Sequence, residues 1–376
     1  MKRLFLLSAL AIVAICSSSC GSSSKQESQS DSSQSGAPAK PEPPVRYGWD
    51  GVPLYGDVES VVVTTYNLEE KFGEVVRGDI KGSEKYYFNE AGDVIEEAKY
   101  NSDGSLREKE TRKYDASGNE IEWASYESDG SLDDKYTYKY DSAGNMIEWA
   151  DFSSDGSLND KNTYKYDASG NKIEEAHYDS DGSLEWKEVY KYDSSGNIIE
   201  FARYGSLDVK TIYKYDSAGN IIESASYDSD GSLDGKNIYK YDSAGNMIEW
   251  ALYDSDGSLN WKGVCKYDAS GKEIESASYE SDGSLTDKVI YKYDSSGNKI
   301  EEASYESDGS LKKKTIYKYD SAGNKIEEAY YNPDGSLDCK IVAKYDSSRN
   351  IIELTIYLGE ALIPNYQIVY EITYRK

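Results

Sequence analysis

The chain has 376 residues and a formal net charge of −27, because 69 Asp and Glu outnumber 42 Lys and Arg. An acidic surface of this size repels a phosphate backbone, so the charge argues against nucleic acid as a partner. Tyrosine supplies 37 side chains, against 5 Phe and 3 Met. We therefore expect a thin body whose packing uses rings that keep a hydroxyl near water or near a hydrogen-bond partner.

The N-terminus has the pattern of an export signal. Residues 1–3 are Met-Lys-Arg, and residues 4–15 form an apolar run that has signal-peptide length and is too short to span a bilayer. Residues 17–21, Ser-Ser-Ser-Cys-Gly, resemble a bacterial lipobox, in which Cys20 is acylated and becomes the mature N-terminus. We therefore predict a signal peptide over residues 1–19 and an exported protein that is lipid-anchored to the bacterial envelope, at the outer membrane or the cell surface.

Two alternatives to this anchor stay open. Ser17 stands where a lipobox normally has Leu, so an ordinary cleaved signal without lipid is one of them. Cys16 is a competing acylation site, although the bulky Ile15 precedes it, where signal processing requires a small residue.

Composition divides the rest of the chain into four segments. Residues 20–46 are Ser, Gln, Pro and Lys with almost no apolar side chain, so they are predicted to be a disordered tether. Residues 83–357 carry a tandem repeat, and residues 47–82 and 358–376 flank it. The flanking segments are predicted to cap the repeat with strands at Val58–Tyr66, Val75–Tyr87, Asn350–Leu358 and Tyr366–Tyr374.

The repeat is marked by a Lys-Tyr-Asp triplet. Its spacing is 26 residues throughout, except for 23 between Tyr192 and Tyr215, where the missing residues fall in a loop. Self-similarity at such a period indicates a stack of like units rather than several globular domains. The triplet tyrosines are Tyr114, Tyr140, Tyr166, Tyr192, Tyr215, Tyr241, Tyr267, Tyr293, Tyr319 and Tyr345.

Each copy reads as one β-hairpin and its connection. Asp216–Asn220 and Asp230-Gly231 have turn chemistry, and the runs between them are rich in Tyr, Ile, Thr and Val. A four-residue loop places Lys214 opposite Glu223 and Tyr215 opposite Ile222, which gives an opposite-charge pair beside an apolar pair. Every one of the ten copies has this Lys and this Glu.

In this register, apolar side chains fall on both faces of the sheet. Tyr213, Tyr215 and Ile222 point one way, whereas Ile212, Ala225 and Tyr227 point the other. Open twisted sheets rarely exceed about 10 strands without curling. We therefore predict an all-β fold in which tandem hairpins form a long antiparallel sheet, coiled into a superhelix or open spiral, with capping strands at both ends.

The repeat resembles a known family. Residues 140–145, Tyr-Asp-Ser-Ala-Gly-Asn, with Asp155-Gly156 ten residues later, are similar to the YD repeats of bacterial Rhs proteins and animal teneurins. The resemblance covers roughly residues 83–357 and implies a coiled β-sheet shell, which in some members encloses a toxin domain. This chain is much shorter, lacks the family's Asp-Pro-x-Gly-Leu motif and has no toxin-sized domain after the repeats, which argues against a closed, toxin-holding shell. MORN-type hairpin repeats are a weaker second likeness.

Catalytic and metal-binding chemistry has little to draw on. His177 is the single histidine, at a position that is Ser, Asp, Arg or Leu in other copies, so it is expected to be a tolerated surface residue. The carboxylate pairs recur in every copy, whereas a catalytic dyad needs one distinctive pocket. The Asp254–Ser258 loop is expected to be a plain turn, with weak cation binding as the alternative. Cys265 and Cys339 lie almost three repeats apart and are expected to stay unbridged.

Aromatic residues vary between copies and are the candidate binding residues. One position carries Trp123, Trp149, Phe201 and Trp250, and in other copies Glu or Ser. A position that accepts both Glu and Trp is expected to be exposed, and exposed Trp suits stacking on sugar rings or docking a protein. Packing between neighbouring strands is the alternative. Trp186 and Trp261 occupy a second variable position of the same kind.

The sequence therefore predicts a non-catalytic envelope lipoprotein without a cofactor. We expect it to present an acidic β-repeat surface for binding carbohydrate or extracellular protein, and to contact the membrane through its N-terminal lipid. A purely structural envelope spacer is the first alternative. A glycan-processing enzyme is the second.

Overall fold

The computed structural model describes residues 45–46, 54–205, 208–359 and 364–375. Its first two strands, β1 (Val45–Arg46) and β2 (Leu54–Tyr55), form a small antiparallel pair. The predicted signal peptide, Cys16, Cys20 and the tether up to residue 44 lie outside the described residues.

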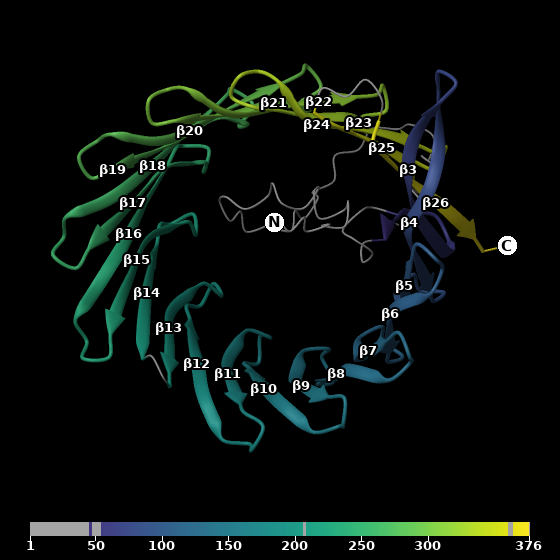
Figure 1. The fold of residues 1–376 in the computed structure, drawn as a ribbon. Coiled ribbons are helices and arrows are strands. Elements are labelled where there is room, and N and C mark those ends of the chain that lie inside the picture. Colours follow the sequence, from purple (N-terminus) through teal and green to yellow (C-terminus); the bar gives the residue numbers. More distant parts are fainter. Residues whose placement is uncertain (1–44, 47–53, 206–207, 360–363, 376) are drawn as a thin grey trace, which may run out of the picture.

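The described body is a ring of antiparallel strands, β3 to β26, in which each strand pairs with the next along the chain and β26 pairs with β3 (Figure 1). The strands are β3 (Val58–Lys71), β4 (Glu74–Phe88), β5 (Val94–Asn101), β6 (Leu106–Tyr114), β7 (Glu120–Glu127), β8 (Leu132–Tyr140), β9 (Met146–Ser153), β10 (Leu158–Tyr166), β11 (Lys172–Tyr178), β12 (Leu184–Tyr192), β13 (Ile198–Tyr204), β14 (Val209–Tyr215), β15 (Ile221–Asp228), β16 (Leu233–Tyr241), β17 (Met247–Asp254), β18 (Leu259–Tyr267), β19 (Glu273–Glu280), β20 (Leu285–Tyr293), β21 (Lys299–Glu306), β22 (Leu311–Tyr319), β23 (Lys325–Tyr331), β24 (Leu337–Tyr345), β25 (Ile351–Leu358) and β26 (Tyr366–Tyr374).

The sheet is therefore a closed barrel, and the predicted open spiral is wrong. The segments expected to cap two separate ends instead pair with each other, because Tyr366–Tyr374 aligns with Val58–Asn67 along almost its whole length. Closure satisfies the backbone groups of both terminal strands at once, which separate caps achieve only partly. The all-β hairpin repeat itself is confirmed.

The two faces of the barrel wall are distinguished by the chain that enters it. Leu54 of β2 packs in one cluster with Val61, Ile368 and Tyr370, and Figure 1 shows the short purple β2 inside the ring. We call the face that carries these side chains the lumenal face, and the opposite one the outer face. Side chains alternate between them along every strand.

The hairpin register is partly as predicted. Lys214 lies opposite Glu223, with Nζ and Oε1 2.6 Å apart, which confirms the charge pair. Tyr215, however, lies opposite Ile221 and not Ile222, because the register shifts by one residue between Lys214 and Tyr215. Such a β-bulge leaves one residue unpaired and sharpens the local twist. The same shift follows the Lys of every copy whose pairing reaches that Tyr.

Each bulge leads into a turn that is held by the Asp of the triplet. Asp216 Oδ1 accepts hydrogen bonds from the backbone N–H groups of Ala218 and Asn220, and its Oδ2 accepts one from the Asn220 amide. These bonds, the side-chain amide of Asn220 first, hold the pKa of Asp216 below its usual value. Gly219 supplies the positive φ of 84° that the turn requires. This local chemistry explains why the pattern Tyr-Asp-x-x-Gly-Asn recurs.

The outer face carries a ladder of ion pairs around the ring. Each Glu of the pattern bonds the Lys of its own hairpin, and several also bond a Lys of the next strand: Glu174 Oε1 lies 2.7 Å from Lys165 Nζ and its Oε2 2.5 Å from Lys187 Nζ. The hydrogen bond from Lys165 lowers the pKa of Glu174. Exposed pairs are individually weak, but their repetition fixes which residues oppose each other.

Triplet tyrosines join neighbouring hairpins on the lumenal face. The hydroxyl of Tyr241 donates to the carbonyl oxygen of Ile221, 20 residues earlier, at 2.9 Å. Nine other triplet tyrosines make the equivalent bond, at 2.6 to 2.9 Å. A phenylalanine would pack in the same place without this link, which accounts for the preference for tyrosine.

The closing strands hold a buried apolar cluster. Val61, Ile356, Ile368 and Tyr370 are at most 4% exposed, and the cluster reaches Leu54. Asn350, the turn Asn of the last copy, is fully buried; its amide oxygen accepts from Tyr55 N–H at 2.6 Å and its amide nitrogen donates to the Tyr55 carbonyl at 2.9 Å. The last turn thus clasps β2 onto the closing strands.

Replacing Tyr241 with Phe should remove one inter-hairpin hydrogen bond and leave the ring packing intact. We expect the free energy of unfolding to fall by about 0.5–1.5 kcal/mol, measured by denaturant unfolding. Tyr239→Phe, two residues earlier on the same face, is the matched control and should cost less. An equal effect of the two substitutions would contradict the bridging role of the Tyr241 hydroxyl.

Candidate binding surface on the lumenal face

The outer face is nearly constant from copy to copy. Ten copies have a Lys directly before the triplet Tyr and a second Lys four residues before the first. Ten copies have the Glu that pairs with the first Lys, and ten have a buried Ala that is 1–4% exposed. The Ala residues are Ala98, Ala124, Ala150, Ala176, Ala202, Ala225, Ala251, Ala277, Ala303 and Ala329. Each lies opposite a Lys whose stem can cover it, as Ala251 lies opposite Lys262.

The lumenal face, in contrast, varies between copies at two positions of each hairpin. The position between the Glu and the Ala is Trp123, Trp149, Glu175, Phe201, Ser224, Trp250, Ser276, Glu302 and Glu328 in successive copies. The position after the Ala is Ser125, Asp151, His177, Arg203, Ser226, Leu252, Ser278, Ser304 and Tyr330. Taken together, the two positions give a different pair of side chains in every one of these copies except two, which both have Ser and Ser. The barrel therefore combines a nearly constant outer face with a lumenal face whose chemistry changes around the ring.

The structure places all six candidate aromatics on the lumenal face, and all six are partly buried. Trp123 and Trp149 are brought together by Tyr136, whose ring centroid is 4.8 Å from that of Trp123 and 5.6 Å from that of Trp149. Trp123 Nε1 also donates to Glu110 Oε2 at 3.0 Å. These rings are thus packed on one another as well as facing the lumen, so the expected simple exposure does not describe them.

A second aromatic cluster surrounds His177. Its ring stacks on Trp186 at 5.2 Å, its Nδ1 lies 2.6 Å from Asn162 Oδ1, and the Arg203 guanidinium lies 4.5 Å from the centre of the Trp186 ring. His177 is therefore a lumenal, stacked residue and not an outer-surface one. In the next sector, Phe201 lies against Tyr190 at 5.4 Å.

A third cluster joins Trp250 and Trp261, whose centroids are 5.7 Å apart with an interplanar angle of 71°. Gly263 lies directly opposite Trp250 on β18. A Cβ at this glycine would come within 2.1 Å of Trp250 Cζ2, so the indole lies on the space that a side chain would fill. Only the absence of a side chain at Gly263 permits this ring position.

A charged network that the sequence did not single out lines β4 to β7. Lys99 Nζ lies 2.6 Å from Glu108 and 3.1 Å from Glu97, and Arg112 Nη2 lies 2.9 Å from Glu110. Burial raises the pKa of Glu97, which the Lys99 charge opposes. The sequence could have revealed this network, because Glu97 and Glu110 occupy the positions that vary between copies. The structure pairs these two residues across β5 and β6.

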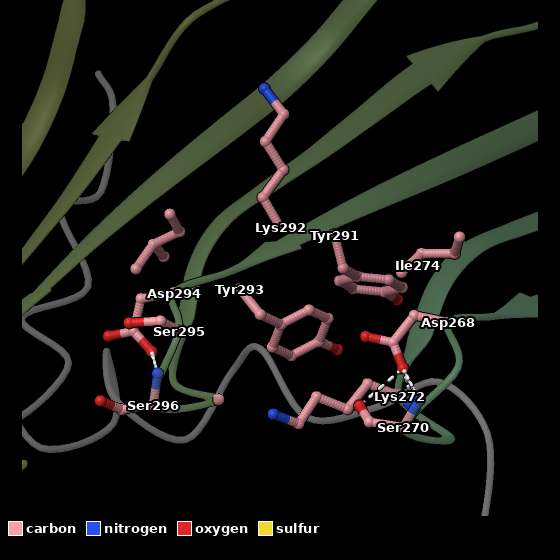
Figure 2. Close-up of a pocket in the computed structure, with 12 residues that line it drawn as sticks. Asp268, Ser270, Lys272, Ile274, Tyr291, Lys292, Tyr293, Asp294, Ser295 and Ser296 are labelled. Atoms are coloured by element: carbon pink, nitrogen blue, oxygen red, sulfur yellow. Dashed lines mark hydrogen bonds between the residues drawn. The ribbon is translucent and has the colours of Figure 1, made fainter.

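Grooves between successive turns also open on the lumenal face. Figure 2 shows one of them, in which Tyr291 and Tyr293 lie along the groove while Lys292 points to the opposite side of the sheet. Asp268 and Asp294 hold the two turns that border it. Burial raises the pKa of Tyr291 to about 12, so the hydroxyl stays protonated at neutral pH. An equivalent groove follows Tyr164 and Tyr166, which makes it a property of the repeat.

Acidic residues gather at the two rims of the barrel and not across its outer wall. Each outer-face unit has two Lys for one Glu, whereas the turns carry Asp residues such as Asp242 and Asp256, whose carboxylates accept backbone N–H bonds. The predicted acidic sheet surface is thus divided into a lysine-rich wall and acidic rims. The Asp254–Ser258 loop is one such turn, and the described residues contain no group of three side chains suited to a metal ion.

Two further findings concern the remaining candidates. Cys265 and Cys339 lie on β18 and β24 and form no disulfide; burial raises the pKa of the Cys339 thiol to about 11. No helix in the described part of the chain is long and apolar enough to cross a membrane.

Comparisons with known proteins return distant structural likenesses. No family model matches the chain, and no curated protein matches it. The crystal structure of TcdB2-TccC3 is 14% identical over 84% of this chain and 22% of its own, with a TM-score of 0.32. The Tc holotoxin pore of Photorhabdus luminescens is 12% identical over 76% of this chain and 19% of its own, with a TM-score of 0.30. The chain thus spans about a fifth of these toxin chains.

A porin-like protein from Bacteroides uniformis is 11% identical over 59% of this chain and 93% of its own, with a TM-score of 0.27. Likenesses at this level of identity and TM-score establish neither a family nor a function for this chain.

Replacing Trp123 with Ser should show how much of this surface is packing. The variant loses the ring contact with Tyr136 and the bond to Glu110, so we expect a loss of about 1–3 kcal/mol in the free energy of unfolding. Trp149→Ser loses a tilted ring contact with Tyr136 and a hydrogen bond with the neutral Tyr138 hydroxyl, and about 0.5–1.5 kcal/mol is expected. Denaturant unfolding measures both. A smaller effect for Trp123 than for Trp149 would contradict the described contacts.

Proposed function

We propose that this chain is a non-catalytic, lipid-anchored envelope protein that binds carbohydrate or protein on the lumenal wall of its barrel. The observation that carries the proposal is the contrast between the constant outer face and the variable lumenal face. Residues that only hold the strands of the repeat in register are expected to recur in every copy, as the Lys and Glu of the outer ladder do. Residues that meet a non-repeating ligand are expected to differ between sectors.

The dimensions of the barrel are compatible with a ligand inside it. Twenty-four strands spaced about 4.8 Å apart give a circumference of about 115 Å and a backbone-to-backbone diameter of at least about 37 Å, which strand tilt widens further. A barrel of this diameter, after its lumenal side chains are subtracted, can hold an oligosaccharide, a polypeptide segment or a small domain. The aromatic clusters and the charged network supply different contacts around this space.

Catalysis is not part of the proposal. Glu97 and Glu110 form one distinctive carboxylate pair, but Lys99 and Arg112 bind these carboxylates, and Trp123 donates to Glu110. Carboxylates engaged in this way serve the packing of the wall. The single histidine is stacked on Trp186 and bonded to Asn162.

The repeat is proposed to be a relative of the YD repeats of Rhs and teneurin proteins. Support comes from the role of the shared residues: the triplet Tyr links hairpins, and the triplet Asp holds the turn. The anchor is proposed at Cys20, on the sequence pattern alone.

Blocking the lumen should abolish binding. Starting from the mature chain with Cys265→Tyr, which copies the residue at matched positions, and Cys339→Ser, which adds neither charge nor volume to a buried site, a cysteine is placed at lumenal Ser304 or at outer Lys292. Each is coupled to a 5-kDa polyethylene glycol, and binding is measured on arrays of neutral and acidic glycans and on immobilised cationic protein. We expect the Ser304 adduct to lose binding and the Lys292 adduct to keep it.

Retained binding in the Ser304 adduct would place the ligand outside the lumen. Absence of binding by the unlabelled protein to every probe would favour the spacer alternative.

A further inference from the structure

One sector of the lumenal face differs from the others in having no charge away from the rims. Between β15 and β19 the lumenal side chains away from the strand ends are uncharged and mostly small, apart from a few aromatic and apolar ones; Asp254 and Glu280 stand at the strand ends. They are Ser224, Ser226, Gly235, Asn237, Tyr239, Trp250, Leu252, Trp261, Gly263, Cys265, Ser276 and Ser278. The neighbouring sectors carry groups such as Arg203 and Glu302 at equivalent positions.

Within this sector, two indole rings form a corner. Trp250 lies flat over the backbone of Gly263, because three of its ring atoms fall within 2.5 Å of the place where a Cβ would stand. One face of the indole is therefore against the sheet and the other is turned to the lumen. The plane of the Trp261 ring makes an angle of 71° with that of Trp250, and the two ring centroids are 5.7 Å apart. The two rings therefore meet as the two sides of a corner, with Trp250 as its floor.

Polar side chains border this corner. Tyr239 lies opposite Trp250 on β16, and Ser278 lies opposite Gly263 on β19, so a hydroxyl stands on either side of the floor. Asn237 lies opposite Leu252, which in turn lies opposite Trp261. Glu280 lies opposite Trp261 at the rim end of β19. The corner thus combines an apolar platform with uncharged hydrogen-bonding groups and one carboxylate on its rim side.

We propose that the corner formed by Trp250, Trp261 and Gly263 is a binding subsite for a neutral carbohydrate. This inference rests on the proposed lumenal binding function and names its ligand class in one sector. The C–H groups on one side of a pyranose ring pack on an indole face, while its hydroxyl groups need uncharged donors and acceptors at the edge of the platform.

The chemistry of the sector selects against other ligands. An anionic polymer would be desolvated here without an opposite charge in reach, since the charged groups at the edge of the sector, Asp254 and Glu280, are themselves acidic. An apolar ligand would offer no hydrogen bond to the Tyr239 and Ser278 hydroxyl groups that border the platform. A sugar ring satisfies both the platform and its border.

Gly263 gives a test that removes no aromatic residue. Gly263→Val fills the space beneath Trp250 and forces the indole off the sheet; Val289 occupies the matched position one copy later, so the backbone accepts this residue. Titration calorimetry is carried out on the mature chain with cellohexaose, maltohexaose, chitohexaose and mannohexaose. We expect at least one to bind, and Gly263→Val to weaken it at least tenfold.

Two further variants separate the site from general effects on the fold. Trp250→Ser, which copies Ser224 and Ser276, should also weaken binding at least tenfold, whereas Val289→Ala, at the matched position of the next hairpin, should leave it within twofold. Near-ultraviolet circular dichroism checks that each variant is folded.

Unchanged sugar affinity in both folded variants would overturn the inference. So would binding that is restricted to charged glycans or to protein. In either case, loss of that binding in the Ser304 adduct would leave the proposed lumenal function standing, so the two failures can be told apart.

Discussion

The pairing of β26 with β3 is the constraint on which the rest of this structure depends. Tyr366–Tyr374 aligns with Val58–Asn67, so the first and last strands of the sheet are hydrogen-bonded to each other. Without that pairing the sheet would have two free edges and no inside. With it, every strand of the ring has two neighbours, and one face of the repeat becomes a lumenal wall. The buried cluster of Val61, Ile368 and Tyr370, together with the Asn350 clasp on Tyr55, concentrates apolar packing at this seam.

A division of labour between the two faces follows from closure. The outer face holds the register through the Lys–Glu ladder and buries an Ala in each copy, so it has little freedom to vary. On the lumenal side, the triplet tyrosines link neighbouring hairpins near one rim through their hydroxyl groups. The other lumenal positions are not needed for this link, so their side chains can vary. Those positions hold Trp, Glu, Ser, Arg and Gly in different copies. A barrel built from nearly identical hairpins can thus have a lumenal face whose side chains differ from one group of strands to the next.

Local features could be read from the sequence, and those that depend on distant strands could not. The hairpin, its turns and the Lys214–Glu223 pair were predictable because each is decided by residues within one copy. The bulge at Tyr215 was missed, since composition does not reveal a one-residue shift in pairing. Closure was missed because it depends on whether the curvature summed over all copies brings residue 366 back to residue 67. The floor at Trp250 needed Gly263, whose meaning appears only once β17 and β18 are aligned.

A disulfide across the closing seam tests the account most directly. Thr64 and Val369 lie opposite each other on β3 and β26, and opposite Cα atoms in an antiparallel pair are about 4.5–5.5 Å apart, within disulfide range. In the chain with Cys265→Tyr and Cys339→Ser, we expect Thr64→Cys with Val369→Cys to cross-link almost completely under mild oxidation. The bridge should give faster migration on a non-reducing gel, since it closes a loop of most of the chain. Thr64→Cys paired with Val264→Cys, on a remote strand, should not cross-link. Failure of the Thr64–Val369 pair to cross-link in the folded protein would mean an open sheet, and would contradict the closed barrel and its lumenal wall.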